Sequence, residues 1–141
     1  MEHHFTTSGI ICVDPNTKKF LVLQSRFNDK AWSFSKGFIE KNEKPLQSAL
    51  RELYEETGIS LSSNDLLENA YVVKIKMKKP TRKIPSGVKI IKFWVAHMHL
   101  DTPIQLSREH SKFAWLSDFS EIEIHEEFTE LSQKIKNECF D

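Results

Sequence analysis

The sequence contains little cysteine, glycine or proline. Its two cysteines, Cys12 and Cys139, match neither the spacing of a metal site nor a disulfide framework, so we expect buried or idle thiols in a reducing compartment. Four glycines and five prolines leave no low-complexity tract. No segment repeats, and the length predicts a single domain over residues 1–141.

Long apolar runs and an excess of charge are absent too. No stretch reaches the ~18 apolar residues of a membrane helix, and the N-terminus lacks the charged and apolar regions of a signal peptide. Basic and acidic residues number 20 each, so a polyanionic ligand must meet a local basic patch. We expect a monomeric protein of the cytoplasm or nucleus that does not bind membranes.

Hydropathy patterns predict a sheet followed by a helix. Strands are predicted at residues 5–13, 19–24, 71–77, 88–100 and 113–116, the first two as a hairpin. Residues 25–36 show no sustained period, and we expect them to cross the sheet with Trp32 and Phe34 in the core. A helical region should begin at 117–119, and an amphipathic helix over 125–140 should pack on the sheet.

Residues 37–59 carry the strongest pattern in the chain. Pro45 suits the first turn of a helix and Gly58 the left-handed residue just beyond its end, so we expect a loop followed by a helix. Apolar residues recur at the i, i+3, i+4 and i+7 spacing of a buried helix face: Leu46, Ala49, Leu50 and Leu53.

The same helix gathers three acids on one face. Glu52, Glu55 and Glu56 lie at i, i+3 and i+4, where like charges destabilise a helix. Arg51 forms one i, i+4 pair with Glu55, which is too little to balance them. An arbitrary E-x-x-E-E is more often a solvated acidic face, but hard oxygen ligands at this spacing suit Mg²⁺ or Mn²⁺ bridging phosphate oxygens.

A longer pattern favours the metal site. The segment fits G-x5-E-x7-R-E-U-x-E-E-x-G-U, where U is a bulky aliphatic residue, through Gly37, Glu43, Arg51, Glu52, Leu53, Glu55, Glu56, Gly58 and Ile59. It resembles the Nudix box of hydrolases that act on nucleoside diphosphates linked to another group. The resemblance implies an α/β/α sandwich with a mixed β-sheet between helices, and Mg²⁺-dependent (or Mn²⁺-dependent) cleavage of a pyrophosphate link.

The resemblance also implies roles for the box residues. Glu52, Glu55 and Glu56 become metal ligands, and one of them helps to activate water. We favour Glu52 as this catalytic base without separating it from Glu56. Arg51 joins the catalytic group by orienting the glutamates, and Glu43 shapes the loop that enters the helix.

A second, narrower resemblance lies outside the box. Residues 89–96 (KIIKFWVA), residues 106–116 (LSREHSKFAWL) and the Lys36 entry to the box are similar to asymmetrical diadenosine tetraphosphate hydrolases. This resemblance implies that Glu109 is a further metal ligand and that Lys36 and Lys89 contact substrate phosphates.

Two more positions follow from the second resemblance. Phe113 stands where that family stacks an aromatic ring on adenine, and the alternative is a core aromatic in a short strand. His110 is either a proton shuttle near pH 7 or a structural hydrogen-bonding residue. Ala31 and Ser35 occupy positions where the family commonly has histidine and proline, which leaves the exact substrate open.

A basic segment is the remaining signal. Residues 74–92 contain no acid but eight cations: Lys74, Lys76, Lys78, Lys79, Arg82, Lys83, Lys89 and Lys92. Most of these should be solvated, but together they form a plausible patch for polyphosphate or nucleic acid. The loop at 78–87 is longer and more basic than is usual in the second family.

These patterns predict an enzyme whose partner is a small dinucleoside polyphosphate. The first hypothesis is asymmetric hydrolysis of diadenosine tetraphosphate to ATP and AMP. A diphosphoinositol polyphosphate or the 5′ end of RNA is the alternative substrate. A catalytically inactive module that binds nucleotides or RNA is the alternative from another class, although the box glutamates are intact.

Overall fold

The structure, a computed structural model, describes residues 5–27 and 31–139. Its strands are β1 (Thr7–Asp14), β2 (Lys19–Ser25), β3 (Trp32–Ser33), β4 (Ser35–Phe38), β5 (Leu66–Lys76), β6 (Val88–His97) and β7 (His110–Leu116). The α-helices are α1 (Pro45–Thr57) and α2 (Glu126–Cys139), and a 3₁₀ turn, η1, covers Ser63–Asp65.

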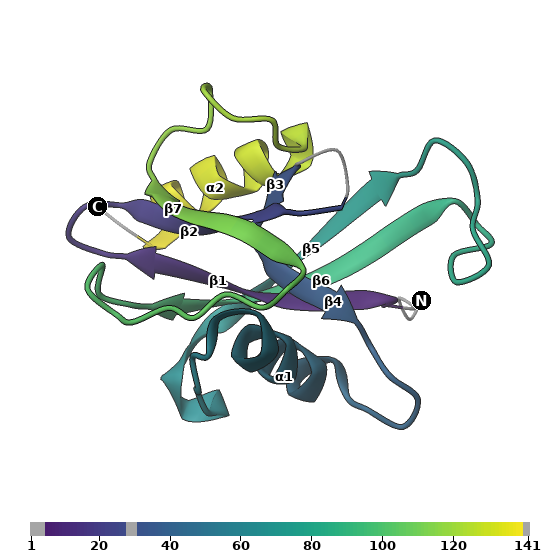
Figure 1. The fold of residues 1–141 in the computed structure, drawn as a ribbon, viewed down its shortest axis with the longest axis horizontal. Coiled ribbons are helices and arrows are strands. Elements are labelled where there is room, and N and C mark those ends of the chain that lie inside the picture. Colours follow the sequence, from purple (N-terminus) through teal and green to yellow (C-terminus); the bar gives the residue numbers. More distant parts are fainter. Residues whose placement is uncertain (1–4, 28–30, 140–141) are drawn as a thin grey trace.

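Strand β1 is the central strand of a mixed seven-stranded sheet. It runs parallel to β6, antiparallel to β4 through its first half and antiparallel to β2 at its end. The strand order is β3-β2-β1-β6-β5, with β4 paired to β1 and β7 paired to β2. Helix α1 covers one face of the sheet and α2 the other (Figure 1), so every residue of β1 is buried. The expected α/β/α sandwich is confirmed.

Helix α1 forms where its sequence signals predict it. Pro45 occupies the first turn, and Gly58 ends the helix with φ 78° while its N–H donates to the Tyr54 carbonyl. Ala49 and Leu53 are completely buried in one core cluster with residues of β1, β2 and β6. This packing fixes which side of α1 faces the sheet, and therefore where its glutamates point.

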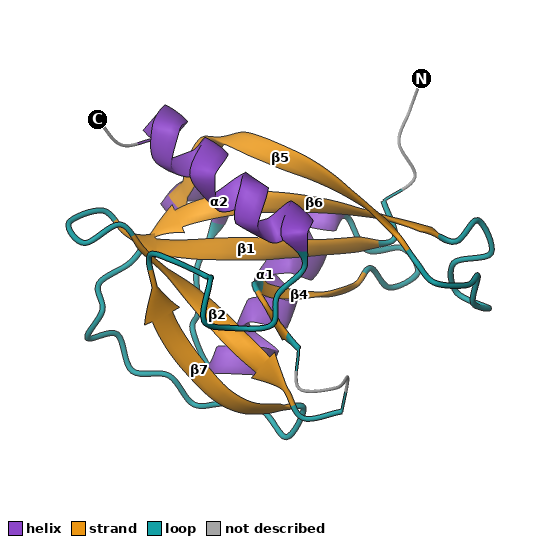
Figure 2. Ribbon diagram, turned by 90° about the horizontal axis from the view of Figure 1, so that it is seen from above, coloured by secondary structure: helices purple, strands orange, loops and turns teal. Residues whose placement is uncertain are grey.

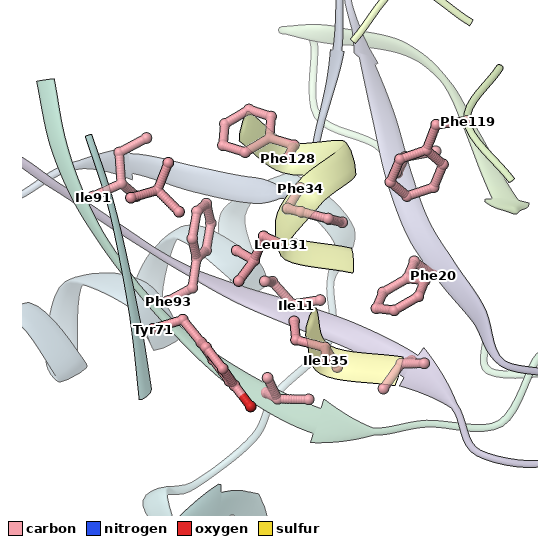
Figure 3. Packing of buried hydrophobic residues seen from close by; sticks show 14 residues of the cluster. Ile11, Phe20, Phe34, Tyr71, Ile91, Phe93, Phe119, Phe128, Leu131 and Ile135 are labelled. Atoms are coloured by element: carbon pink, nitrogen blue, oxygen red, sulfur yellow. The ribbon is translucent and has the colours of Figure 1, made fainter. Parts of the chain in front are cut away.

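Helix α2 packs on the opposite face through an aromatic cluster. The Phe34 ring lies 5.7 Å from Phe93 and 5.5 Å from Phe128, measured between centroids (Figure 3). Leu131 and Ile135 extend the same buried stripe along the helix. The predicted core position of Phe34 is confirmed, while Trp32 is only partly buried at the edge of the cluster.

Several elements differ from the sequence predictions. Strands β3 and β4, with two and four residues, are too short to show a period. Strand β5 begins at Leu66 rather than 71 because an irregular pairing between Leu66 and Ala70 interrupts the alternation, and β7 begins three residues early, at His110. The helical start at 117–119 is wrong.

The segment before α2 is instead irregular, with a turn in which the Ile122 N–H donates to the Phe119 carbonyl at 3.3 Å, and it meets the sheet at β3. The Trp32 N–H donates to the Glu123 carbonyl at 2.9 Å, and Trp32 pairs with Ile124. Figure 2 shows this connection as a loop that leads into α2. Among the described residues, no helix has the length and apolar character required to cross a membrane.

Close packing at Gly9 yields the first prediction. A Cβ atom at this position of β1 would lie 2.1 Å from the Ser35 carbonyl oxygen and 2.8 Å from Cε1 of Phe93. We expect Gly9→Ala to lower the free energy of unfolding by about 3 kcal/mol, near the upper end of overpacking effects. Urea denaturation measures this change.

The neighbouring Ser8 provides the control. Its hydroxyl is buried and, among the described residues, has no hydrogen-bond partner. Ser8→Ala should therefore leave stability unchanged or raise it. Equal destabilisation by both substitutions would contradict the importance of space at Gly9.

Candidate active site

Arg51 is the centre of the acidic cluster on α1. Its Nε and Nη2 atoms donate to the two carboxylate oxygens of Glu43 at 2.7 and 3.0 Å. Its Nη1 atom donates to Glu52 at 3.0 Å and to Glu55 at 3.1 Å, and Nη2 also reaches the Phe38 carbonyl at 3.2 Å. One guanidinium thus joins the end of β4, the loop and the helix.

The loop residue Glu43 and the β4 residue Gly37 have distinct physical tasks. Hydrogen bonds from Arg51 lower the pKa of Glu43 to about 2, so this carboxylate is charged at neutral pH. A Cβ atom at Gly37 would lie 2.1–2.4 Å from the carboxylate atoms of Glu52. Glycine therefore allows Glu52 to rest directly on the backbone of β4.

Glu56 is the most deeply buried acid of the box. Its side chain lies beneath β4 with only 4% of its surface exposed. The Ser35 hydroxyl donates to Oε1 of Glu56 at 2.8 Å, and the Lys36 N–H donates to the same oxygen at 3.2 Å. Both bonds come from β4, so the strand that precedes the box fixes the orientation of this carboxylate.

Burial leaves the two inner acids short of compensating charge. It raises the pKa of Glu56 to about 8, an effect that the Ser35 hydrogen bond opposes and the neighbouring Glu52 increases. Burial also raises the pKa of Glu52, although Arg51 counteracts this. The pair therefore favours either a shared proton or a bound cation.

The fourth predicted acid lies beside the helix. Glu109 lines a cavity of about 470 Å³ together with Phe27, Glu52, Glu55, Glu56, Ser107 and Arg108. The loop that carries Glu109 is fixed by two backbone bonds: Ser107 N–H to the Glu56 carbonyl, and Arg26 N–H to the Glu109 carbonyl. All four predicted metal ligands therefore share one cavity.

This donor set fits a divalent cation. Four carboxylates supply the oxygen ligands that Mg²⁺ and Mn²⁺ prefer, and the buried Glu56 and the partly buried Glu52 have raised pKa values. Within residues 5–27 and 31–139, no three acidic, histidine or cysteine side chains already stand in metal-binding geometry. Glu52 and Glu55 point toward Arg51 instead, so they must rotate to bind an ion.

Of the two predicted cationic residues, Lys36 lies near the acids and Lys89 lies near Lys36. Burial lowers the pKa of Lys36 to about 8, with a further decrease from Lys89, while Glu56 and Glu52 raise it. Burial also lowers the pKa of Lys89. The structure therefore brings both predicted phosphate contacts together, with Lys36 inside the field of the box glutamates.

His110 and Phe113 occupy the start and middle of β7. Burial lowers the pKa of His110, and its Nδ1 atom lies 3.5 Å from the Ser107 hydroxyl in the loop that carries Glu109. Phe113 is 43% exposed, which contradicts the alternative of a core aromatic. Neither residue lines the acidic cavity, so the structure does not gather them with the glutamates.

Four contributors to the site were not predicted from the sequence. Ser35 binds Glu56, and Phe27, Ser107 and Arg108 line the cavity. Serine at position 35, where the resembling family commonly has proline, could have indicated a contact with the box glutamates. Residues 35 and 37 of one strand face the same side, and Gly37 belongs to the box. Phe27 lies in a segment without periodicity, which gave no signal.

The buried Glu56 carboxylate makes stability depend on pH in metal-free protein. Because its folded-state pKa of about 8 exceeds the ordinary 4.5, the associated stability is complete below pH 4.5 and is lost as pH rises through 8. We expect the urea midpoint in EDTA to fall from about pH 5 to about pH 8.5. Glu56→Gln should remove most of this dependence, and an unchanged slope would contradict the assignment.

Comparison with known proteins gives the same picture. The NUDIX domain family matches residues 3–133. The asymmetrical bis(5′-nucleosyl)-tetraphosphatase of Rattus norvegicus is 36% identical over 105 residues, which cover 74% of this chain and 67% of that protein. The Caenorhabditis elegans m7GpppN-mRNA hydrolase dcap-2 is 45% identical over 53 residues, which cover 37% of this chain and 7% of that protein.

Solved structures extend the similarity over the whole fold. A crystal structure of a C. elegans Ap4A hydrolase binary complex has a TM-score of 0.76 and 25% identity, covering 95% of this chain and 96% of that one. The resemblances stated from the box and from the segments outside it are both confirmed. Because the family model matches most of this chain, the chain belongs to the Nudix family and is a Nudix hydrolase.

Proposed function

We propose that this Nudix hydrolase cleaves diadenosine tetraphosphate asymmetrically, to ATP and AMP, with Mg²⁺ or Mn²⁺ as its cofactor. The observation that carries the proposal is the single cavity shared by Glu52, Glu55, Glu56 and Glu109. The rat relative named asymmetrical bis(5′-nucleosyl)-tetraphosphatase supports the choice of substrate.

The arrangement around the cavity suits a phosphate chain with a base attached. Lys36 supplies positive charge near the glutamates, Lys89 adds a second charge close to Lys36, and Phe113 presents an exposed ring on β7. A polyphosphate can neutralise the lysines while an adenine stacks on the ring. Diadenosine tetraphosphate carries both a polyphosphate chain and an adenine base, whereas free pyrophosphate lacks the base.

The reaction requires an oriented water and a group that accepts its proton. Water attacks an end phosphate, the bond from that phosphorus to the bridging oxygen breaks, and ATP leaves. Glu52 or Glu56 accepts the proton of the water. The hydrogen bonds from Ser35 and Lys36 fix the orientation of the Glu56 carboxylate for this role. A divalent ion held by the four carboxylates would screen the phosphate oxygens.

Arg51 acts on this chemistry indirectly. Its guanidinium already donates to three carboxylates and one carbonyl, so it has little capacity left for a phosphate. We assign it to the orientation of Glu52 and Glu55. His110 is placed to relay a proton or to hold the loop through Ser107.

Product analysis tests the proposed reaction. Purified protein with Mg²⁺ is incubated in H₂¹⁸O with diadenosine tetraphosphate, a diphosphoinositol polyphosphate or triphosphorylated RNA. We expect ATP and AMP from the dinucleotide, with ¹⁸O in AMP only. Two molecules of ADP would refute asymmetric attack, preferred turnover of another substrate would replace the proposal, and no turnover at all would favour an inactive binding module.

Glu56→Gln is the catalytic control in the same assay. The substitution keeps the size of the side chain but removes its charge and its ability to bind a proton. We expect kcat to fall by about 10²-fold or more, with a folded protein by circular dichroism. An unchanged rate would remove Glu56 from the site.

Phe113 is expected to recognise the base. Phe113→Leu removes the π face but keeps apolar volume, and it should raise KM for diadenosine tetraphosphate by about tenfold, since stacking contributes about 1–3 kcal/mol. Phe113→Trp should preserve KM. If the leucine variant loses stability and keeps its KM, Phe113 is a packing residue and not a base platform.

A further inference from the structure

The basic loop between β5 and β6 folds back on itself. The Met77 N–H donates to the Gly87 carbonyl at 2.7 Å, and the Ile84 N–H donates to the Thr81 hydroxyl at 3.0 Å. Ile84 is only 2% exposed, so the loop is anchored by an apolar side chain at its middle. The position of Lys83, next to Ile84, is therefore defined by the fold of the loop.

Lys83 reaches the strand that leads into the box. Its Nζ atom lies 4.3 Å from the centroid of the Phe38 ring, and Nζ of Lys89 lies 5.4 Å from the same ring. Phe38 is 38% exposed at the end of β4. Figure 1 shows the β5–β6 connection projecting from the end of the sheet where β4 also ends.

Lys36 brings a third ammonium group to this region. It lies two residues before Phe38 in β4 and is close enough to Lys89 for the two charges to repel. In the described part of the chain, no carboxylate forms an ion pair with any of these three lysines. Glu52 and Glu56 attract Lys36 without forming an ion pair with it, so the fold itself holds the like charges near one another.

We propose that Lys83 joins Lys36 and Lys89 in one binding site for the phosphate chain of the substrate, with the Phe38 ring as its floor. The inference deepens the proposed function, because it assigns the basic loop to the same polyphosphate ligand. A linear polyphosphate offers several negative oxygens at short intervals, and it relieves the repulsion among three ammonium groups. A neutral or singly charged ligand cannot do this.

The site distinguishes Lys83 from the other cations of the loop. Lys78, Lys79 and Arg82 are exposed like Lys83 but, unlike it, have no aromatic contact among the described residues. They should remain solvated and contribute little beyond the general field. Lys79 is therefore a matched control, since its replacement changes the net charge of the same loop by the same amount.

The test compares Lys83→Ala, Lys83→Arg and Lys79→Ala in two measurements. Calorimetry in EDTA measures the Kd of inorganic tripolyphosphate, and a steady-state assay measures KM for diadenosine tetraphosphate. We expect Lys83→Ala to weaken both by about tenfold, because charge-assisted bonds to phosphate are among the strong ones. Lys79→Ala should change either value less than about twofold, as expected of an exposed charge, and Lys83→Arg should restore binding.

The two measurements separate this inference from the proposed function. Equal effects of Lys83→Ala and Lys79→Ala on tripolyphosphate binding would overturn the inference, whatever the enzyme hydrolyses. If the wild-type protein does not cleave diadenosine tetraphosphate but Lys83→Ala still weakens tripolyphosphate binding, the proposed substrate is wrong and the phosphate site stands.

Discussion

The architecture of the candidate active site depends on one guanidinium, which binds three carboxylates at once. Arg51 donates to Glu43, Glu52 and Glu55, and also to the carbonyl of Phe38 at the end of β4. Glu52 and Glu55 would repel each other more strongly without it. Because Arg51 also binds the backbone of β4, it joins the acidic face of the helix to the strand that precedes it.

The inner acid, Glu56, obeys a different constraint. Two donors from β4 orient its carboxylate, but neither carries a full charge, so the burial is satisfied in hydrogen bonds and not in electrostatics. Glu52 adds a second partly buried carboxylate at the same place. Proteins tolerate buried carboxylates without enough positive charge around them where a cation binds. The Ser35 hydroxyl orients Glu56 without neutralising its charge.

Much of this organisation was readable in the sequence because it is local. The caps of α1, its buried face and the spacing of its glutamates all lie within residues 37–59. Predictions failed where the structure is determined by distant partners. Strand β4 forms because β1 pairs with it, and the segment before α2 is held at β3 by the hydrogen bond from Trp32 to Glu123 instead of forming a helix. The same limit hid the contact of Lys83 with Phe38, since only tertiary folding relates a hairpin loop to β4.

The loop that carries Glu109 links parts of the chain that are remote in sequence. Ser107 binds the carbonyl of Glu56, and Arg26 binds the carbonyl of Glu109, which lies 83 positions later in the sequence. Contacts of such high contact order form late and are lost with global unfolding. The acidic cavity therefore exists only in the fully folded chain, and any ligand that occupies it stabilises the whole protein rather than one segment, so that thermal shift becomes a direct reporter of binding.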